Sequence, residues 1–181
     1  MADNQHSTSI CARTLEQLYI NFQISCNQPF NLIHATSFRN LIQYINPEAD
    51  HLLPESPSTA KALIIDQFTI EKEAIRQQLQ ASQSCIHLSL DSWTSGNHLP
   101  ILGAIGHTIV GGQLQEYVLA LREIQGRHTG ENLAPMVLDI LQDYGITHKL
   151  GYIQMDNATN NDTLIAALSS GMSFPSQYLR D

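Results

Sequence analysis

The stretch that decides the fold is CIHLSLDSWT (85–94), followed by PILGAIGHTIV (100–110) and QLQEYVLALREI (113–124). Its apolar residues recur at a short period and many are β-branched, which is typical of β-strands. Gly111 and Gly112 separate the second run from the third, and two glycines between strands favour a tight hairpin. The sequence therefore predicts three strands here, the second and third antiparallel.

A helix and a fourth strand are expected after this meander. Apolar residues at helical spacing predict a helix over about 132–144, with Pro135 in its first turn, where the missing N–H costs nothing. Gly145 is suited to end that helix. LGYIQM (150–155) predicts the fourth strand, and a last helix over about 162–170 completes the order βββαβα.

The first part of the chain is expected to be helical. Apolar spacing predicts a helix over about 14–24 and another ending at residue 45. A proline-rich loop, NPEADHLLPESPS (46–58), should then lead into a longer helix. The fold class is therefore α+β, with a helical N-terminal extension followed by a mixed sheet. The expected divisions are a loose N-terminus with a short helix (1–27), a helical extension (28–82), the sheet with its helices (83–174) and a tail (175–181).

Charge and cysteine content exclude several classes of protein. The chain has 9 Lys and Arg against 17 Asp and Glu, a net charge of −8, which is the wrong sign for a self-sufficient nucleic-acid binder. Three widely spaced cysteines, Cys11, Cys26 and Cys85, predict neither a disulfide framework nor a zinc site and favour a reducing compartment. We also expect no signal peptide and no membrane span.

Two aspartates come at the ends of predicted strands. Asp91 closes the first strand and Asp156 closes the fourth. If the fourth strand returns parallel beside the first through a right-handed crossover, the two strand ends lie about 5 Å apart. Neighbouring carboxylates repel unless they are protonated or bridged by a cation, and hard oxygen ligands suit Mg²⁺ or Mn²⁺. The alternative is that each Asp hydrogen-bonds its own backbone at a strand end.

Five segments occur in an order and at a spacing that resemble a known family. They are QPFNLIHATSFRNLIQYINPEA (28–49), LDSWTS (90–95), GRHTGENLA (126–134), LQDYGI (141–146) and MDNATNNDTL (155–164). Together they resemble the helical segment and the RNase H-like core of hAT-superfamily transposases, especially fungal ones. The resemblance covers about residues 28–174.

The resemblance implies a truncated RNase H-like core in a nuclear protein that acts on DNA. In the intact family an acidic triad with Mg²⁺ cleaves and joins DNA strands, and the resemblance makes Asp91 the first acid and Asp156 the second. The family's third acid, a downstream Glu, has no counterpart in this sequence, and neither has its BED-type zinc finger or its dimerisation segment. We therefore expect a transposase fragment or remnant that is inactive alone and self-associates through exposed core.

Two other functions stay open. The first is a non-enzymatic interaction or regulatory module, which an acidic surface fits slightly better than it fits DNA binding. The second is a small metal-dependent nuclease that uses Asp91, Asp156 and Glu131. Glu131 is a candidate accessory carboxylate, or else a solvated acid favoured by the dipole of its helix.

Other side chains near these motifs have less specific interpretations. His128 is a candidate for contact with a phosphate or with a carboxylate, or else part of a structured turn. Trp93 is expected to be packed rather than to line the site. The remaining histidines of the second half show no ligand spacing and are expected to be scattered.

Overall fold

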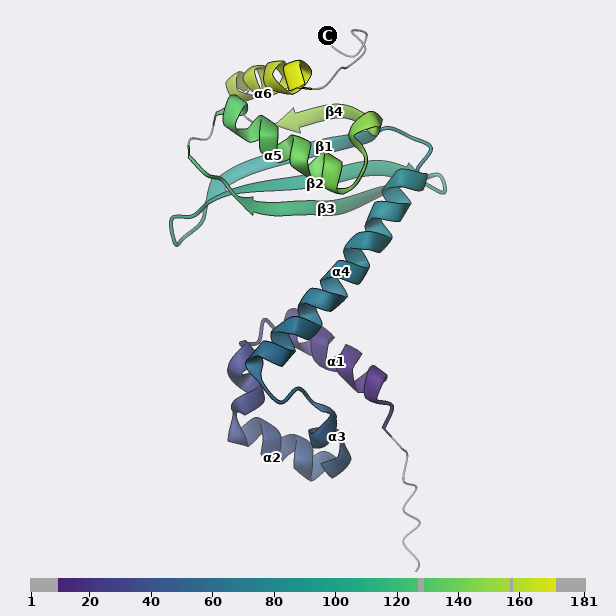
Figure 1. Ribbon diagram of the computed structural model, residues 1–181, viewed down its shortest axis with the longest axis vertical. Helices are drawn as coiled ribbons and strands as arrows, with labels where there is room; N and C mark the ends of the chain where they lie inside the picture. Colours follow the sequence, from purple (N-terminus) through teal and green to yellow (C-terminus); the bar gives the residue numbers. More distant parts are fainter. Residues whose placement is uncertain (1–9, 127–128, 157, 172–181) are drawn as a thin grey trace, which may run out of the picture. The chain divides into compact units, whose positions relative to one another are not determined.

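The computed structural model describes residues 10–126, 129–156 and 158–171 (Figure 1). Contacts divide the chain into two units, residues 1–72 and 73–181. The elements are, in chain order, α1 (Ala12–Ser25), η1 (Phe30–His34), α2 (Thr36–Ile45), α3 (Pro47–Leu52), α4 (Pro57–Ala81), β1 (Ile86–Thr94), β2 (Pro100–Val110), β3 (Gln113–Glu123), α5 (Gly130–Asp143), η2 (Thr147–Lys149), β4 (Leu150–Met155) and α6 (Ala158–Gly171). Helices followed by a mixed sheet confirm the α+β class.

The first unit is built from short helices around a small core. Tyr19, Ile33, Leu53 and Ala60 are buried together there. They come from α1, η1, the segment after α3 and the first turn of α4. Each helix contributes few apolar residues, so the unit depends on polar contacts as well.

Arg39 of α2 supplies several of those polar contacts. Its guanidinium donates to the backbone carbonyls of Ile33 at 2.9 Å, Asp50 at 2.9 Å and Pro54 at 2.6 Å. It also pairs with the Asp50 carboxylate at 3.0 Å. One planar cation thus ties η1, α3 and the segment before α4 to α2, a use for which the fixed fork of arginine donors is suited.

The proline-rich stretch 46–58 is not the continuous loop that its composition predicts. It contains α3, with Pro47 in the first turn and the Asn46 side chain accepting the Glu48 N–H at 2.9 Å. The prediction was wrong because Pro47 begins this helix instead of preventing it, and a proline at the first helical position loses no hydrogen bond.

The second unit contains a four-stranded sheet of order β3-β2-β1-β4. β1 pairs antiparallel with β2 and parallel with β4, and β2 pairs antiparallel with β3. Gly111 and Gly112, with φ of 58° and 78°, form the hairpin turn between β2 and β3, and both positive angles are those of a two-residue hairpin loop. The predicted hairpin and the return of the fourth strand beside the first are confirmed.

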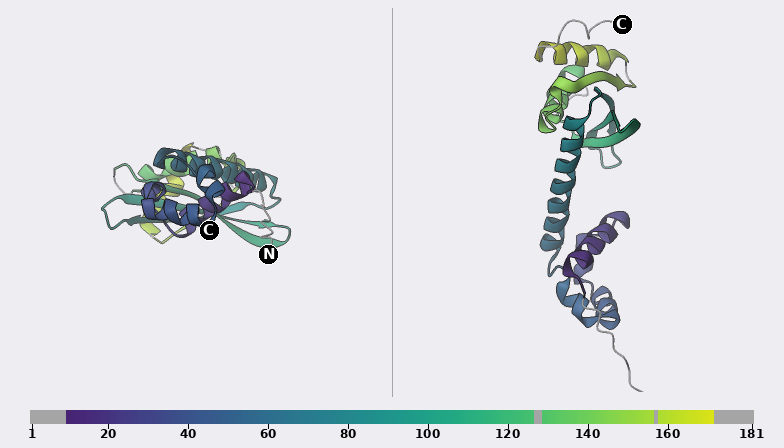
Figure 2. Two further views of the ribbon diagram at one scale, coloured as in Figure 1. Left: turned by 90° about the horizontal axis from the view of Figure 1, so that it is seen from below. Right: turned by 90° about the vertical axis from the view of Figure 1, so that its right-hand side faces the viewer.

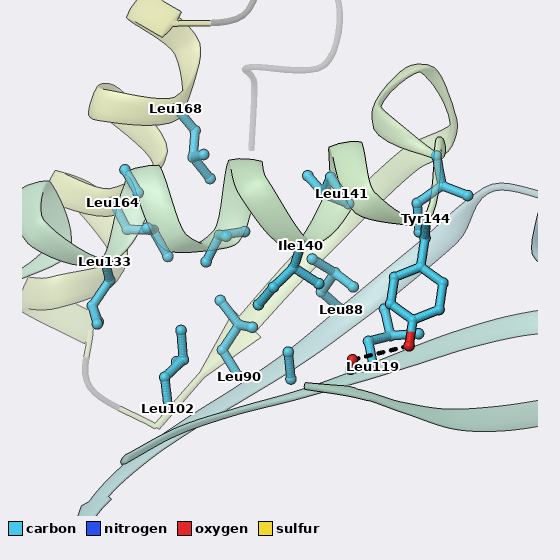
Figure 3. Packing of buried hydrophobic residues seen from close by; sticks show 14 of the residues in the cluster. Leu88, Leu90, Leu102, Leu119, Leu133, Ile140, Leu141, Tyr144, Leu164 and Leu168 are labelled. Carbon is cyan, nitrogen blue, oxygen red and sulfur yellow. Dashed lines mark hydrogen bonds between the residues drawn. The ribbon is translucent and has the colours of Figure 1, made fainter. Parts of the chain in front are cut away.

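One face of this sheet is covered by helices. α5 lies on that face, and α6 packs against α5 beside β4, the edge strand (Figures 1 and 2). The buried residues between the layers are mostly leucine and isoleucine (Figure 3). They include Leu88, Leu90, Leu102 and Leu119 from the sheet, Leu133, Ile140 and Leu141 from α5, and Leu164 and Leu168 from α6.

The two helices of this layer begin earlier than their sequence pattern predicts. α5 begins at Gly130, so Pro135 lies in its second turn, where it removes a hydrogen bond to the carbonyl of Glu131. α6 begins at Ala158, four residues before the predicted start. Both starts were misplaced because polar first turns carry no apolar periodicity.

The end of α4 is joined to the sheet unit by Lys149. Its Nζ donates to the carbonyls of Leu79 at 3.2 Å, Gln80 at 2.5 Å and Ser82 at 2.5 Å. The Gln80 side chain in turn donates to the carbonyl of Tyr144 at 2.9 Å. The last carbonyls of a helix have no partner within it, so a lysine here satisfies them and opposes the negative end of the helix dipole.

Replacement of Lys149 by methionine keeps the aliphatic chain and removes these donors. We expect Lys149→Met to lower the free energy of unfolding of the sheet unit by about 2 kcal/mol, measured by urea denaturation. Lys61→Met removes the same charge from the exposed side of α4 and should change stability little. Equal losses in both variants would contradict a specific role for Lys149.

The hydroxyl of Tyr144 is buried at the end of α5. It donates to the carbonyl of Leu119 on β3 at 3.0 Å (Figure 3). Burial raises the pKa of Tyr144 above its usual 10.0, the nearby Asp143 adds to the rise, and Arg122 opposes it. The neutral phenol is therefore the form that the fold favours.

This pKa shift predicts a loss of stability in alkali. The folded chain holds the Tyr144 proton at a pH where the unfolded chain releases it, so the contribution is complete below about pH 10 and falls as pH rises further. Tyr144→Phe should remove this part of the pH dependence and cost about 1 kcal/mol near neutral pH, because the Leu119 carbonyl loses its donor. Urea titrations from pH 7 to 11 test this, with the exposed Tyr44→Phe as control.

Candidate functional site

Asp91 does not end its strand. β1 continues to Thr94, and Asp91 pairs with Gly103 of β2. The prediction that Asp91 closes β1 was therefore wrong, because the pairing with β2 continues after the pairing with β4 has ended. Asp156 immediately follows the last residue of β4.

The register of β1 and β4 brings the two aspartates to neighbouring positions. Leu90 lies opposite Met155, and Asp91 and Asp156 are the next residue of each strand. Neighbouring strands are about 4.8 Å apart. Leu90 and Met155 are buried under the helices while both aspartates are exposed, and side chains alternate along strands, so the aspartates lie toward the uncovered face.

These two side chains fit part of a magnesium or manganese site. Mg²⁺ is commonly held by one or two carboxylates, with water and phosphate oxygens as the other ligands. The described residues give neither Asp91 nor Asp156 a hydrogen bond or an ion pair. Over these same residues, however, no group of three His, Cys, Asp or Glu side chains could hold a metal ion.

The other predicted site residues do not join this pair. Glu131 is exposed in the first turn of α5, the helix on the covered face of the sheet, and it forms no three-ligand group with Asp91 and Asp156. That position fits a solvated acid at a helix N-terminus. His128 lies outside the described residues.

Trp93 packs beside the aspartate on the same strand. A Cβ atom on Gly103 would lie 3.0 Å from the indole ring, with a Leu121 methyl at 3.6 Å. The ring thus lies over the glycine opposite Asp91, and 38% of Trp93 is exposed. Trp93 therefore lies within β1 and not after it, packed over Gly103 yet partly exposed on the face that carries Asp91.

Two histidines that we expected to be scattered have defined partners. His87 Nδ1 accepts the backbone N–H of Tyr152 at 3.0 Å. His107 lies between Ser89, whose hydroxyl is 2.8 Å from Nε2, and Glu116, whose carboxylate is 3.3 Å from Nδ1. The signal in the sequence was the alternation of polar residues at 87, 89 and 91, which places them on one face of the strand.

The uncovered face of the sheet also carries large apolar side chains. Ile105, Val118 and Leu121 are 37%, 62% and 67% exposed. Register places them on adjacent strands, with Ile105 opposite Val118 and Gly103 opposite Leu121. A sheet face that contacts water usually carries polar side chains. These exposed apolar side chains are therefore typical of a sheet face that another layer covers.

A four-stranded sheet of this order, with a parallel crossover through α5 and with Asp91 on β1 next to Asp156 directly after β4, defines an α+β domain of the RNase H-like class. The chain belongs to the family of ZBED1 RNase-like domains, whose match covers residues 89–180. Proteins with related sequences include transposases.

Three curated relatives share part of this sequence. The chain is 28% identical to the maize (Zea mays) protein "Putative AC transposase" over 138 residues, 76% of this chain and 17% of the relative, and equally similar to "Putative AC9 transposase". It is 26% identical over 177 residues to "Putative transcriptional regulator tpeD" of Talaromyces stipitatus, which covers 94% of this chain and 21% of the relative. The chain thus spans about a fifth or less of the length of these relatives.

None of the described helices is both long enough and apolar enough to cross a bilayer.

Proposed function

We propose that this chain supplies the first two acids of a hAT-type DNA-cleaving site. The observation that supports this is the register of β1 and β4, which makes Asp91 and Asp156 neighbours on the uncovered side of the sheet. Both carboxylates would bind Mg²⁺ or Mn²⁺. A divalent ion in such a site stabilises the charge that develops on phosphate oxygens during strand cleavage.

The two aspartates are also proposed to be insufficient for catalysis by themselves. The described residues offer no third carboxylate at this position, and an acidic triad needs one to complete the metal coordination. The net charge of −8 opposes unassisted binding of DNA. We therefore propose that the chain acts in the nucleus only together with further transposase segments, and that alone it does not cut DNA.

Metal titration tests the carboxylate pair directly. We expect the purified chain to bind Mn²⁺ with a stoichiometry of about one, and either Asp91→Asn or Asp156→Asn to weaken binding roughly tenfold or more, because each removes a charged ligand. Calorimetry measures both. Asp66→Asn, on the exposed side of α4, removes the same charge and should bind like the wild type.

Three results would contradict the proposal. Absence of Mn²⁺ binding would remove the metal site, and equal binding by all three Asn variants would make it non-specific. Mn²⁺-dependent cleavage of DNA by the chain alone would contradict its proposed inactivity. Loss of that cleavage in Glu131→Gln would then favour the small nuclease that uses Asp91, Asp156 and Glu131.

A regulatory module is the second candidate function. The observation that favours it is the relative whose name describes a transcriptional regulator, because that protein matches 94% of this chain, including the helical extension. Such a module needs no metal. Unchanged partner binding by Asp91→Asn and Asp156→Asn, in a chain that binds no Mn²⁺, would support this function over the first.

Self-association is the partner interaction that the exposed apolar residues support. We expect the wild-type chain to form larger species as its concentration rises, and Val118→Lys with Leu121→Lys to keep it monomeric, because both positions lie on the uncovered face. Light scattering coupled to size exclusion measures this. Leu18→Lys with Ile24→Lys, two exposed positions of α1, is the matched control, and a monomeric wild type would contradict the expectation.

A further inference from the structure

The pairing of β4 with β1 contains one irregularity. Ile86 lies opposite Leu150, and Leu88 lies opposite Ile153. Between these two pairs β1 advances by two residues while β4 advances by three. β4 therefore carries one extra residue, a β-bulge, beside His87.

The bulge decides which residue lies next to Asp91. Regular pairing from Leu150 onward would place Met155 beside Asp91, and Asp156 would be one position too far. The same slip would turn Ile153 away from the core, because a shift of one residue exchanges the two faces of a strand. The extra residue thus keeps Asp156 beside Asp91 while Met155 stays buried and Ile153 stays packed against the core.

Both ends of β4 are fixed independently of the bulge. Lys149 holds the start of the strand through its bonds to the carbonyls at the end of α4. Ile153 and Met155 hold its second half against the core. The chain between these anchors is one residue longer than regular pairing with β1 requires. The extra residue therefore forms the bulge at residues 151–152.

The side chain of His87 stabilises this bulge. A bulge leaves a backbone group without its ladder partner, and His87 Nδ1 accepts the N–H of Tyr152 at 3.0 Å. The two rings are stacked, with centroids 5.4 Å apart and planes at 11°. Gly151 makes room for the imidazole, because a Cβ there would lie 2.7 Å from Nδ1.

We infer that His87 is a positioning residue that stabilises the β4 bulge and so sets Asp156 beside Asp91. Its effect on metal binding rests on the proposed function, whereas its effect on the bulge does not. It touches neither aspartate in any contact that the structure describes. The imidazole acts through Tyr152, by the hydrogen bond from its backbone N–H and by the ring stack.

Substitutions of His87 separate this role from a general effect on the sheet. His87→Ala removes the acceptor, and we expect the Tyr152 amide to exchange with solvent at least tenfold faster by NMR and Mn²⁺ affinity to fall roughly fivefold. His87→Asn keeps an acceptor oxygen near the position of Nδ1 and should restore both. His107→Ala, on the same face but bonded to Ser89 and Glu116, should leave both unchanged.

Deletion of Gly151 provides a second and independent test. It removes the surplus residue, so β4 can pair regularly with both anchors kept and Asp156 still beside Asp91. His87→Ala should then cause no further loss of Mn²⁺ affinity in the deletion background. This background also keeps the inference testable if His87→Ala alone fails to fold.

The outcomes distinguish the inference from the function on which it partly rests. Wild-type protection of the Tyr152 amide in His87→Ala would overturn the inference. So would an equal penalty from His87→Ala, or failure to fold, in the Gly151 deletion. A wild-type chain that binds no Mn²⁺ overturns the proposed site instead, and the amide exchange of Tyr152 then decides the role of His87 by itself.

Discussion

The burial of one side of β1 under α5 is the constraint on which the second unit depends. Leu88 and Leu90 are almost wholly enclosed between the sheet and Ile140 of that helix (Figure 3). Because strand side chains alternate, enclosing these two leucines directs His87 and Asp91 to the other face. The direction of the polar side chains of β1 therefore follows from the burial of its apolar ones.

Strong apolar patterns predicted the elements of the sheet well. The bounds of β2 and β4 agree with their sequence runs because apolar residues fill both strands and turn residues flank them. Helices whose starts are determined by polar residues were predicted less well. α3 was missed because its capping asparagine and first-turn proline also occur in loops, and α6 was shortened because its first turn is polar.

The candidate site could be predicted in outline only. A parallel return of β4 beside β1 is enough to bring two strand ends together, so the adjacency of Asp91 and Asp156 follows from topology. The bulge that keeps the two aspartates adjacent cannot be predicted from the spacing of LGYIQM. Its freed backbone N–H, that of Tyr152, is bonded by the side chain of His87, 65 positions away in the sequence. Long-range acceptors of this kind leave no local pattern.

The narrow space above Gly151 has a consequence for how this sequence can change in evolution. The imidazole of His87 occupies the place that any larger residue at position 151 would need. A larger residue at 151 therefore requires the imidazole at 87 to shift or to be replaced. Among descendants of this domain the two positions should change together, so that a side chain at 151 accompanies a displaced or different side chain at 87.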